Sequence, residues 1–308
     1  MEICNACIHL RITKSTPAMV TRRKTLKSIL LGAAALGSGS LNAGNFSNFI
    51  QPGKRNGNIR HSVCRWCFSS TPLEELCVFG KQIGLSAIDL VGPDDWETLK
   101  RYGLDSSMCN GAELNLVDGW NNPTFHDKLV DNYSEMIPLV AKAGYTNLIL
   151  FSGNRRGMDD ETGLQNCVKG LKRILGLAEK NGVTLQMEVF NSKVDHKDYM
   201  ADNTPWTIEL CKRLDTDNFK ILYDIYHMQI NEGDVIRTIQ NNHQWFGHYH
   251  TAGVPGRNEI DENQELYYPA IMKAIVNTGF KGYVAQEFIP KAADPLGSLA
   301  KSIDICDV

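Results

Sequence analysis

The sequence lacks any run of 18 or more apolar residues, so it predicts no ordinary membrane-spanning helix. It also lacks an excess of basic residues: its formal net charge is −3 at pH 7, whereas nucleic-acid-binding proteins usually carry a basic surface. Beyond residue 45 it contains no low-complexity tract. Apolar residues make up 43% of the chain, enough to build a core, which excludes disorder for most of its length. These features favour a folded domain that neither spans a membrane nor binds nucleic acid.

Cysteine is present in an odd number, nine, and forms two CxxC pairs, Cys4/Cys7 and Cys64/Cys67. Two such pairs together are compatible with a zinc site. The first pair precedes a predicted export signal, so it would be absent from the mature protein. The second pair lies in HSVCRWCF, residues 61–68, which we interpret as a first strand. We therefore expect free thiols, most of them buried.

The N-terminal segment has the layout of an export signal. A basic cluster, TRRKTLK at residues 21–27, is followed by an apolar stretch and then by small residues. The adjacent Arg22 and Arg23 resemble a twin-arginine signal, although Thr25 stands where such signals favour Phe. We interpret residues 1–45 as an extension with this signal, which predicts the twin-arginine export machinery as a partner and a periplasmic or other extracytoplasmic location. The alternative is an amphipathic N-terminal helix on a cytoplasmic protein.

From His61 onward the sequence alternates strand and helix patterns every 25 to 35 residues, the period of βα units. The helix pattern is clearest over residues 126–143, and Gly182 and Gly279 end two later helices. The alternation predicts a single-domain α/β fold, a (β/α)8 TIM barrel over residues 58–308; a doubly wound open sheet is the alternative. The eight expected strands are residues 61–68, 86–91, 106–113, 146–153, 184–191, 219–227, 245–253 and 282–290.

Polar residues close each of the last four expected strands: Glu188, Asp224, His250 and Glu287. They are separated by 36, 26 and 37 residues, about one βα unit each. Because parallel strands of a barrel end at the same face, we expect the four side chains to converge. Three carboxylates and one imidazole suit Mg²⁺ or Mn²⁺ best, with Co²⁺ or Zn²⁺ as further options. Taken singly, each acidic residue could instead cap a helix or pair with a surface base.

Several motifs give a more specific resemblance. The segments YDIYHMQ, HYHTAGVPGRNEID and QEF, with VCRWCF and EVFNSKVDHKDYM, resemble the hydroxypyruvate isomerase family within the xylose isomerase-like TIM barrels. The resemblance covers residues 61–308 and implies metal ligands at Glu188, Asp224, His250 and Glu287. Bacterial hydroxypyruvate isomerases proper tend to have Gln where His250 stands. The His form resembles the ketose epimerases of the superfamily and exported relatives.

The residue types suggest a mechanism. Aldose–ketose isomerisation removes a weakly acidic proton beside a carbonyl, and a divalent metal stabilises the enediolate that forms. Glu188 and Glu287 are the candidates for the proton-transferring pair. His227 and Arg257 are candidate substrate-binding residues, and Glu259 is a candidate partner that holds Arg257 in place. A helix-start histidine and a surface ion pair are the structural alternatives for His227 and Arg257.

The leading interpretation is an enzyme, a metal-dependent isomerase of a small sugar or keto acid. A 3-epimerase or dehydratase of the same superfamily would use the same chemistry. A barrel that binds sugar without converting it is the alternative of another class, and the intact Glu188 and Glu287 argue against it. An endonuclease-type phosphodiesterase would need basic phosphate contacts, which we do not find. The sequence allows a homo-oligomer but does not specify one.

The export signal generates a prediction. Replacing both Arg22 and Arg23 with Lys should leave unprocessed precursor in the cytoplasm, because the signal is recognised by its arginine pair and not by charge alone. Cell fractionation followed by immunoblotting measures this. Lys24→Gln, which changes a neighbouring charge but keeps the pair, is the matched control. An unchanged extracytoplasmic amount of the double variant would contradict the twin-arginine interpretation.

Overall fold

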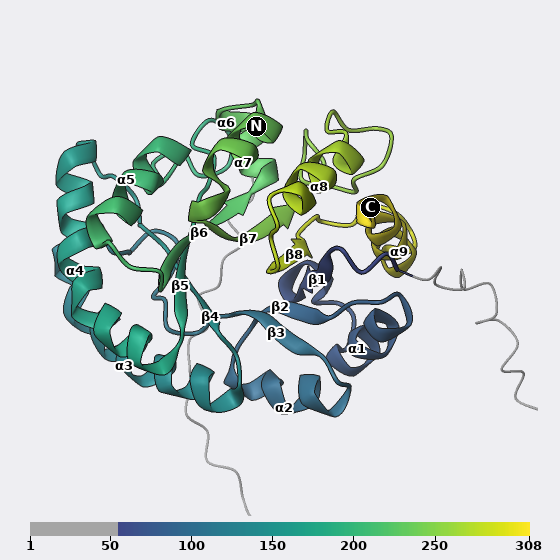
Figure 1. Ribbon diagram of the computed structural model, residues 1–308, viewed down its shortest axis with the longest axis horizontal. Helices are drawn as coiled ribbons and strands as arrows, with labels where there is room; N and C mark the ends of the chain where they lie inside the picture. Colours follow the sequence, from purple (N-terminus) through teal and green to yellow (C-terminus); the bar gives the residue numbers. More distant parts are fainter. Residues whose placement is uncertain (1–54) are drawn as a thin grey trace, which may run out of the picture. The chain divides into compact units, whose positions relative to one another are not determined.

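The structure, a computed structural model, describes residues 55–308 as a closed barrel of eight parallel strands (Figure 1). Each strand pairs with its neighbour in sequence order, and β1 pairs with β8 to close the ring. The strands are β1 (Arg60–Cys64), β2 (Ala87–Val91), β3 (Asp105–Cys109), β4 (Asn147–Leu150), β5 (Thr184–Glu188), β6 (Phe219–Asp224), β7 (Phe246–Thr251) and β8 (Tyr283–Gln286).

The helices form an outer ring around the strands (Figure 1). The α-helices are α1 (Leu73–Gln82), α2 (Pro93–Arg101), α3 (His126–Ala143), α4 (Asp160–Asn181), α5 (Thr204–Leu214), α6 (Ile225–Asn231), α7 (Val235–Asn242), α8 (Tyr268–Asn277) and α9 (Pro295–Cys306). Short 3-10 helices are η1 (Arg65–Phe68), η2 (Pro123–Phe125) and η3 (His243–Trp245). The predicted (β/α)8 barrel is confirmed, and the open-sheet alternative is wrong.

Local sequence accounts for these elements. Helix α3 spans the predicted residues and buries one apolar stripe, in which each member has another three or four residues away: Leu129, Tyr133, Met136, Ile137 and Val140. Helix α4 ends at Gly182, whose φ of 64° lies in the left-handed region that glycine adopts without steric cost. Among the described residues no helix is both long enough and apolar enough to cross a lipid bilayer.

The expectations for the first strand, for the cysteines and for the export segment have different outcomes. The strand expected over residues 61–68 ends early: β1 stops at Cys64, and residues 65–68 form η1. The Arg65 guanidinium donates a hydrogen bond to the Phe68 carbonyl, which closes this turn. The expected free thiols are confirmed for the described cysteines, which are all free and, apart from Cys67, buried. The predicted export segment, residues 1–45, lies outside the described residues.

A buried histidine lies at the start of β1. His61 is 1% exposed, and neither ring nitrogen has a hydrogen-bond partner. Its Nε2 is 3.6 Å from Asp307 Oδ1, beyond hydrogen-bond distance. Burial lowers the pKa of His61 from 6.5 to about 4, and the nearby Asp307 carboxylate only partly offsets this effect.

This histidine should make the fold sensitive to mild acid. Because the folded state resists protonation of His61, the free energy of unfolding should fall as the pH drops from 6.5 toward 4, by up to about 3 kcal/mol. In His61→Gln this part of the pH dependence should be absent, as measured by urea unfolding at each pH. His243→Gln, at an exposed histidine, is the matched control. If the free energy of unfolding fell equally with pH in His61→Gln and in the wild type, His61 would not be the source of the acid sensitivity.

Candidate active site and metal centre

Four polar side chains meet where consecutive strands end. Glu188 and Asp224 are the last residues of β5 and β6, His250 lies one residue before the end of β7, and Glu287 directly follows β8. One ligand atom from each residue lies within 4.8 Å of the corresponding atom of every other. All four residues are at most 3% exposed. The structure thus brings together the four residues that the spacing singled out, while their roles stay predictions.

The cluster concentrates negative charge around one imidazole. His250 Nδ1 lies 3.1 Å from Glu188 Oε1 and 2.9 Å from Glu287 Oε2. Burial, followed by repulsion from Glu287, raises the pKa of Glu188 to about 7. The same two causes raise the pKa of Asp224 well above its usual range.

Glu287 differs from the other two carboxylates. Burial acts to raise its pKa, but the positive charges of Arg257 and His250 outweigh that effect and hold the pKa well below its usual range. The Trp66 indole N–H also donates a 2.8 Å hydrogen bond to Glu287 Oε1. Glu188 and Glu287 therefore differ in proton affinity, as paired catalytic carboxylates do.

Arg257 reaches into the cluster from the loop after β7. Its Nη2 lies 2.5 Å from Glu287 Oε2 and 3.6 Å from Asp224 Oδ2. The guanidinium carbon lies 5.2 Å from the centroid of the Trp66 ring and 5.5 Å from that of the Tyr226 ring, within cation–π range. Arg257 thus lies beside the carboxylates, with two aromatic rings holding its side chain.

The expected pairing of Arg257 with Glu259 is wrong. Glu259 Oε1 instead accepts hydrogen bonds from the backbone N–H groups of Lys291 and Ala292, at 2.8 and 3.0 Å. Glu259 therefore ties its loop to the segment after β8. Arg257 itself has a φ of 58°, in the left-handed region that non-glycine residues seldom adopt. This strained backbone accompanies the inward placement of its side chain.

His227, in the first turn of α6, has a defined orientation. Asn191 Oδ1 accepts hydrogen bonds from the backbone N–H groups of Val194 and Asp195, so the Asn191 amide nitrogen must be the atom 2.7 Å from His227 Nδ1. Nδ1 is then an acceptor and the proton is on Nε2. His227 Nε2 is buried, lacks a hydrogen-bond partner and lies 3.6 Å from Asp224 Oδ2. Burial and Arg257 lower the pKa of His227, so the ring is a neutral donor.

The donor set fits a divalent cation. Asp224 Oδ1 accepts the His227 backbone N–H at 3.2 Å, but Oδ2 is buried without a hydrogen-bond partner. An unpartnered buried carboxylate oxygen is costly unless a cation or proton compensates it. Three carboxylates with one imidazole match the ligand preferences of Mg²⁺ or Mn²⁺, and the imidazole also suits Co²⁺ or Zn²⁺.

Sequence reasoning missed two contributors to this region. Trp66 lies in η1, where a strand was expected, and its contact with Glu287 joins residues 221 positions apart. Asp89 in β2 is fully buried and contacts His250. The available signal was a single carboxylate inside the apolar run SAIDLV, which does not specify what the carboxylate contacts.

Comparison with known families identifies the fold family. Residues 96–305 match the family described as xylose isomerase-like TIM barrel. The chain belongs to this family. The match includes the ends of β5 to β8 and therefore all four residues of the cluster.

Similar proteins have isomerase names. The chain is 33% identical over 120 residues to a 2-oxo-tetronate isomerase of Cupriavidus necator, covering 39% of this chain and 45% of the relative. It is 24% identical over 243 residues to the 2-oxo-tetronate isomerase of Pectobacterium atrosepticum, covering 75% and 92%. A putative hydroxypyruvate isomerase of Danio rerio is 28% identical over 130 residues, covering 42% and 47%. The match thus spans about half the length of two relatives and nearly all of the third.

Solved structures share the fold. An AP endonuclease, family 2, from Brucella melitensis has a TM-score of 0.70 at 22% identity, covering 79% of this chain and 97% of that one. The 3-keto-D-glucoside 4-epimerase YcjR from E. coli has a TM-score of 0.67 at 18% identity, covering 80% and 98%. IolI, a structure with a binding zinc atom, has a TM-score of 0.62 at 14% identity, covering 80% and 95%.

The cluster predicts a metal response that depends on Asp224. Mn²⁺ should raise the thermal unfolding temperature of the wild type through mass action. In Asp224→Asn the affinity should fall by at least about tenfold, because one of three ligand charges is lost. Asn still caps α6, so the metal-free variant should be no less stable than the wild type. Calorimetric scans with and without Mn²⁺ measure both effects, and a wild-type response in the variant would contradict the predicted ligand.

Proposed function

We propose that this protein is a metal-dependent isomerase that interconverts the aldehyde and ketone forms of a small hydroxy-carbonyl substrate. One observation carries the proposal: Glu188 and Glu287 both lie within 3.1 Å of His250 Nδ1, in a buried cluster that Asp224 completes. Membership of the xylose isomerase-like family and the isomerase names of the relatives support it.

The cation would be held by Glu188, Asp224, His250 and Glu287. When bound, it would draw electron density from the substrate's carbonyl and hydroxyl oxygens and stabilise the negative charge of an enediolate. Arg257 and Trp66 keep Glu287 ionised and oriented through the contacts described above. The burial of all four residues excludes bulk water from their carboxylates, which strengthens every charge interaction at the site.

Proton transfer is assigned to the two glutamates. The Glu287 carboxylate takes a proton from the carbon beside the carbonyl, and the electron pair of that C–H bond forms the C=C bond of the enediolate. Glu188 supplies a proton to the former carbonyl carbon, while a hydroxyl proton passes between the two substrate oxygens. Exchange with water restores both side chains, so the reaction needs no oxidant or reductant.

His227 and Arg257 would bind and orient the substrate. His227 presents its Nε2–H toward the cluster, where it can donate to a substrate oxygen. Arg257 can pair with a carboxylate, which fits the keto acids named for the relatives, 2-oxo-tetronate and hydroxypyruvate. Epimerisation at a carbon beside the carbonyl is the second candidate, because two carboxylates of different proton affinity can also act on opposite faces of one carbon.

The proposal includes an extracytoplasmic site of action. The support is the sequence TRRKTLK at residues 21–27 with the apolar stretch that follows it. Export of an already folded protein is compatible with the free, buried cysteines of the barrel, because no disulfide has to form after export.

The test begins with substrates. Wild-type protein with Mg²⁺, Mn²⁺ or Co²⁺ should convert at least one member of a panel of keto acids, aldoses and ketoses, with products identified by NMR. In deuterated water the product should carry deuterium at the carbon that receives the proton. Glu287→Gln should then lower kcat by roughly 10²- to 10⁴-fold, the usual contribution of a general base.

The same variant separates proton transfer from metal binding. Gln keeps an oxygen that can accept from Trp66 and bind a cation, so Mn²⁺ affinity should change much less than kcat. Recovery of full activity by excess Mn²⁺ would show that Glu287 is only a ligand. Deuterium returned to the original carbon with inverted configuration would identify an epimerase instead.

A further inference from the structure

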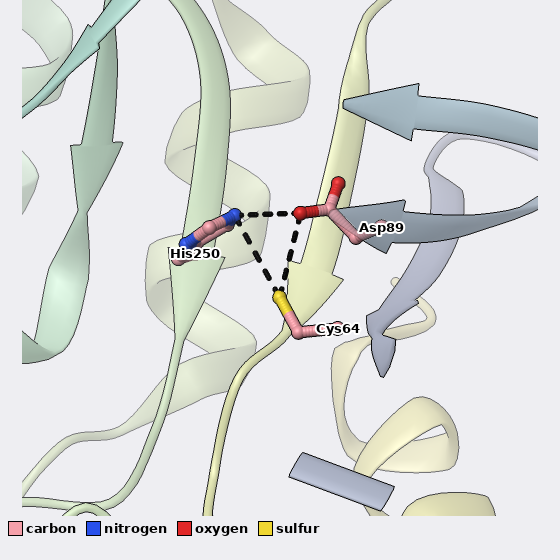
Figure 2. A group of neighbouring side chains, drawn as sticks. All are labelled: Cys64, Asp89 and His250. Atoms are coloured by element: carbon pink, nitrogen blue, oxygen red, sulfur yellow. Dashed lines mark hydrogen bonds and ion pairs between the residues drawn. The ribbon is translucent and has the colours of Figure 1, made fainter. Parts of the chain in front are cut away.

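A second polar layer lies in the barrel lumen directly behind His250. Asp89 of β2 is fully buried, and its Oδ1 lies 3.0 Å from His250 Nε2. Because β1 and β8 separate β2 from β7 in the ring, this contact crosses the lumen. Figure 2 shows the Asp89 carboxylate and the His250 ring pointing toward each other, with the Cys64 thiol beside both.

The backbone at Asp89 is irregular. Its pairing with β3 shifts register on both sides of Asp89, between Ile88 and Asp89 and again between Asp89 and Val91. The next residue, Leu90, has a φ of 53°, which is unfavourable for a leucine. Such bulges re-aim a side chain and are common beside active sites. Here the bulge accompanies a carboxylate that points into the lumen.

Both oxygens of Asp89 are fully engaged. Oδ2 accepts a 2.5 Å hydrogen bond from the Ser107 hydroxyl and lies 2.9 Å from His248 Nε2. Oδ1 accepts from the Cys64 thiol at 3.4 Å in addition to its His250 contact. These contacts fix the carboxylate from three different strands, β1, β3 and β7.

This arrangement decides which nitrogen of His250 keeps its proton when a cation binds. An ionised carboxylate only accepts hydrogen bonds, so the contact with Asp89 requires a proton on His250 Nε2. Nδ1, which lies within 3.1 Å of oxygens of Glu188 and Glu287, donates to them in the absence of a cation and is the nitrogen that gives up its proton when the ring becomes a ligand. The opposite tautomer would turn a proton toward the position where the ring has to bind a cation.

We propose that Asp89 is a positioning residue: it holds His250 in the Nε2–H tautomer, so that Nδ1 is available as a metal ligand. The inference rests on the metal site of the proposed function. Carboxylates that orient a metal-binding histidine raise the basicity of the imidazole and fix the ring. Ser107 and His248 hold the carboxylate in turn, through its second oxygen.

A second metal ion is the alternative explanation for the group of Cys64, Asp89 and His250. The Cys64, Asp89 and His250 ligand atoms lie within 4.8 Å of one another and could in principle surround a second ion. That ion would displace the hydrogen bonds that Asp89 already accepts and would need Nε2 to lose its proton. The geometry therefore favours the hydrogen-bonded role over a second metal site.

Replacing Asp89 with Asn in the full-length protein tests the proposal. The amide NH2 can donate to Nε2 and so shift the ring proton to Nδ1. We expect the Kd for Mn²⁺ to rise roughly 10- to 100-fold, measured by electron paramagnetic resonance of free Mn²⁺ without substrate. Asp217→Asn is the matched control: it makes the same change at a fully exposed aspartate, so its Kd should stay close to that of the wild type.

Three results would overturn the proposal. The first is wild-type Mn²⁺ affinity in folded Asp89→Asn. The second is a His250 ring that carries its proton on Nδ1 in Mg²⁺-loaded wild-type protein, read by ¹⁵N NMR with His250→Gln to assign the signals; this measurement decides even if the Asn variant does not fold. The third is the loss of one bound Co²⁺ per chain in Cys64→Ala, which would reveal a metal at Cys64. Wild-type protein that binds Mn²⁺ normally but converts no substrate would instead refute the proposed reaction and leave the role of Asp89 intact.

Discussion

Three carboxylates buried beside one another are the constraint on which the rest of this site depends. Glu188, Asp224 and Glu287 are each at most 3% exposed and crowd around His250. Buried like charges raise one another's proton affinity, so the site is stable only where positive charge compensates them. Arg257 compensates Glu287, the carboxylate whose pKa is lowered. The negative charge that Arg257 does not compensate makes the cluster a favourable position for a divalent cation.

The barrel tolerates this crowding because the residues that stabilise the fold are separate from the residues of the site. The helices pack on the outside of the strands and bury apolar side chains there, as α3 does with its apolar stripe. The strand ends on one face can then carry polar residues that would destabilise a core elsewhere. Strands β5 to β8 are consecutive neighbours in the ring, so their end residues meet at one face of the barrel.

The lumen behind the cluster is polar as well. Asp89 accepts a hydrogen bond from Ser107, lies 2.9 Å from His248 Nε2 and contacts the cluster through His250. In a low-dielectric interior hydrogen bonds are stronger than in water, so those that Asp89 accepts hold its carboxylate in place. The bulge around Asp89 shows that the backbone itself departs from regular strand geometry to place this carboxylate. Orientation of His250 is thus built into the lumen and does not depend on a surface loop.

The sequence by itself determined the βα alternation, the barrel and the four residues that converge. Each of these follows from a short-range pattern: apolar runs one βα unit apart, with a polar residue where the run ends. The sequence did not determine the partner of Arg257, because the expected pairing with Glu259 was based on proximity along the chain. Arg257 follows β7 and its partner Glu287 follows β8, and these two strands are neighbours in the barrel (Figure 1).

Tertiary structure alone decided the contacts that cross the lumen or the ring closure. Asp89 and His250 are 161 residues apart, and Trp66 and Glu287 are 221 residues apart. Nothing local distinguishes Asp89 in SAIDLV from an acidic residue on the outside of a strand. The side on which it lies depends on the register of β2 against β3, which a single bulge changes. Periodicity therefore revealed which residues end the strands, and only the closed barrel revealed which residues orient them.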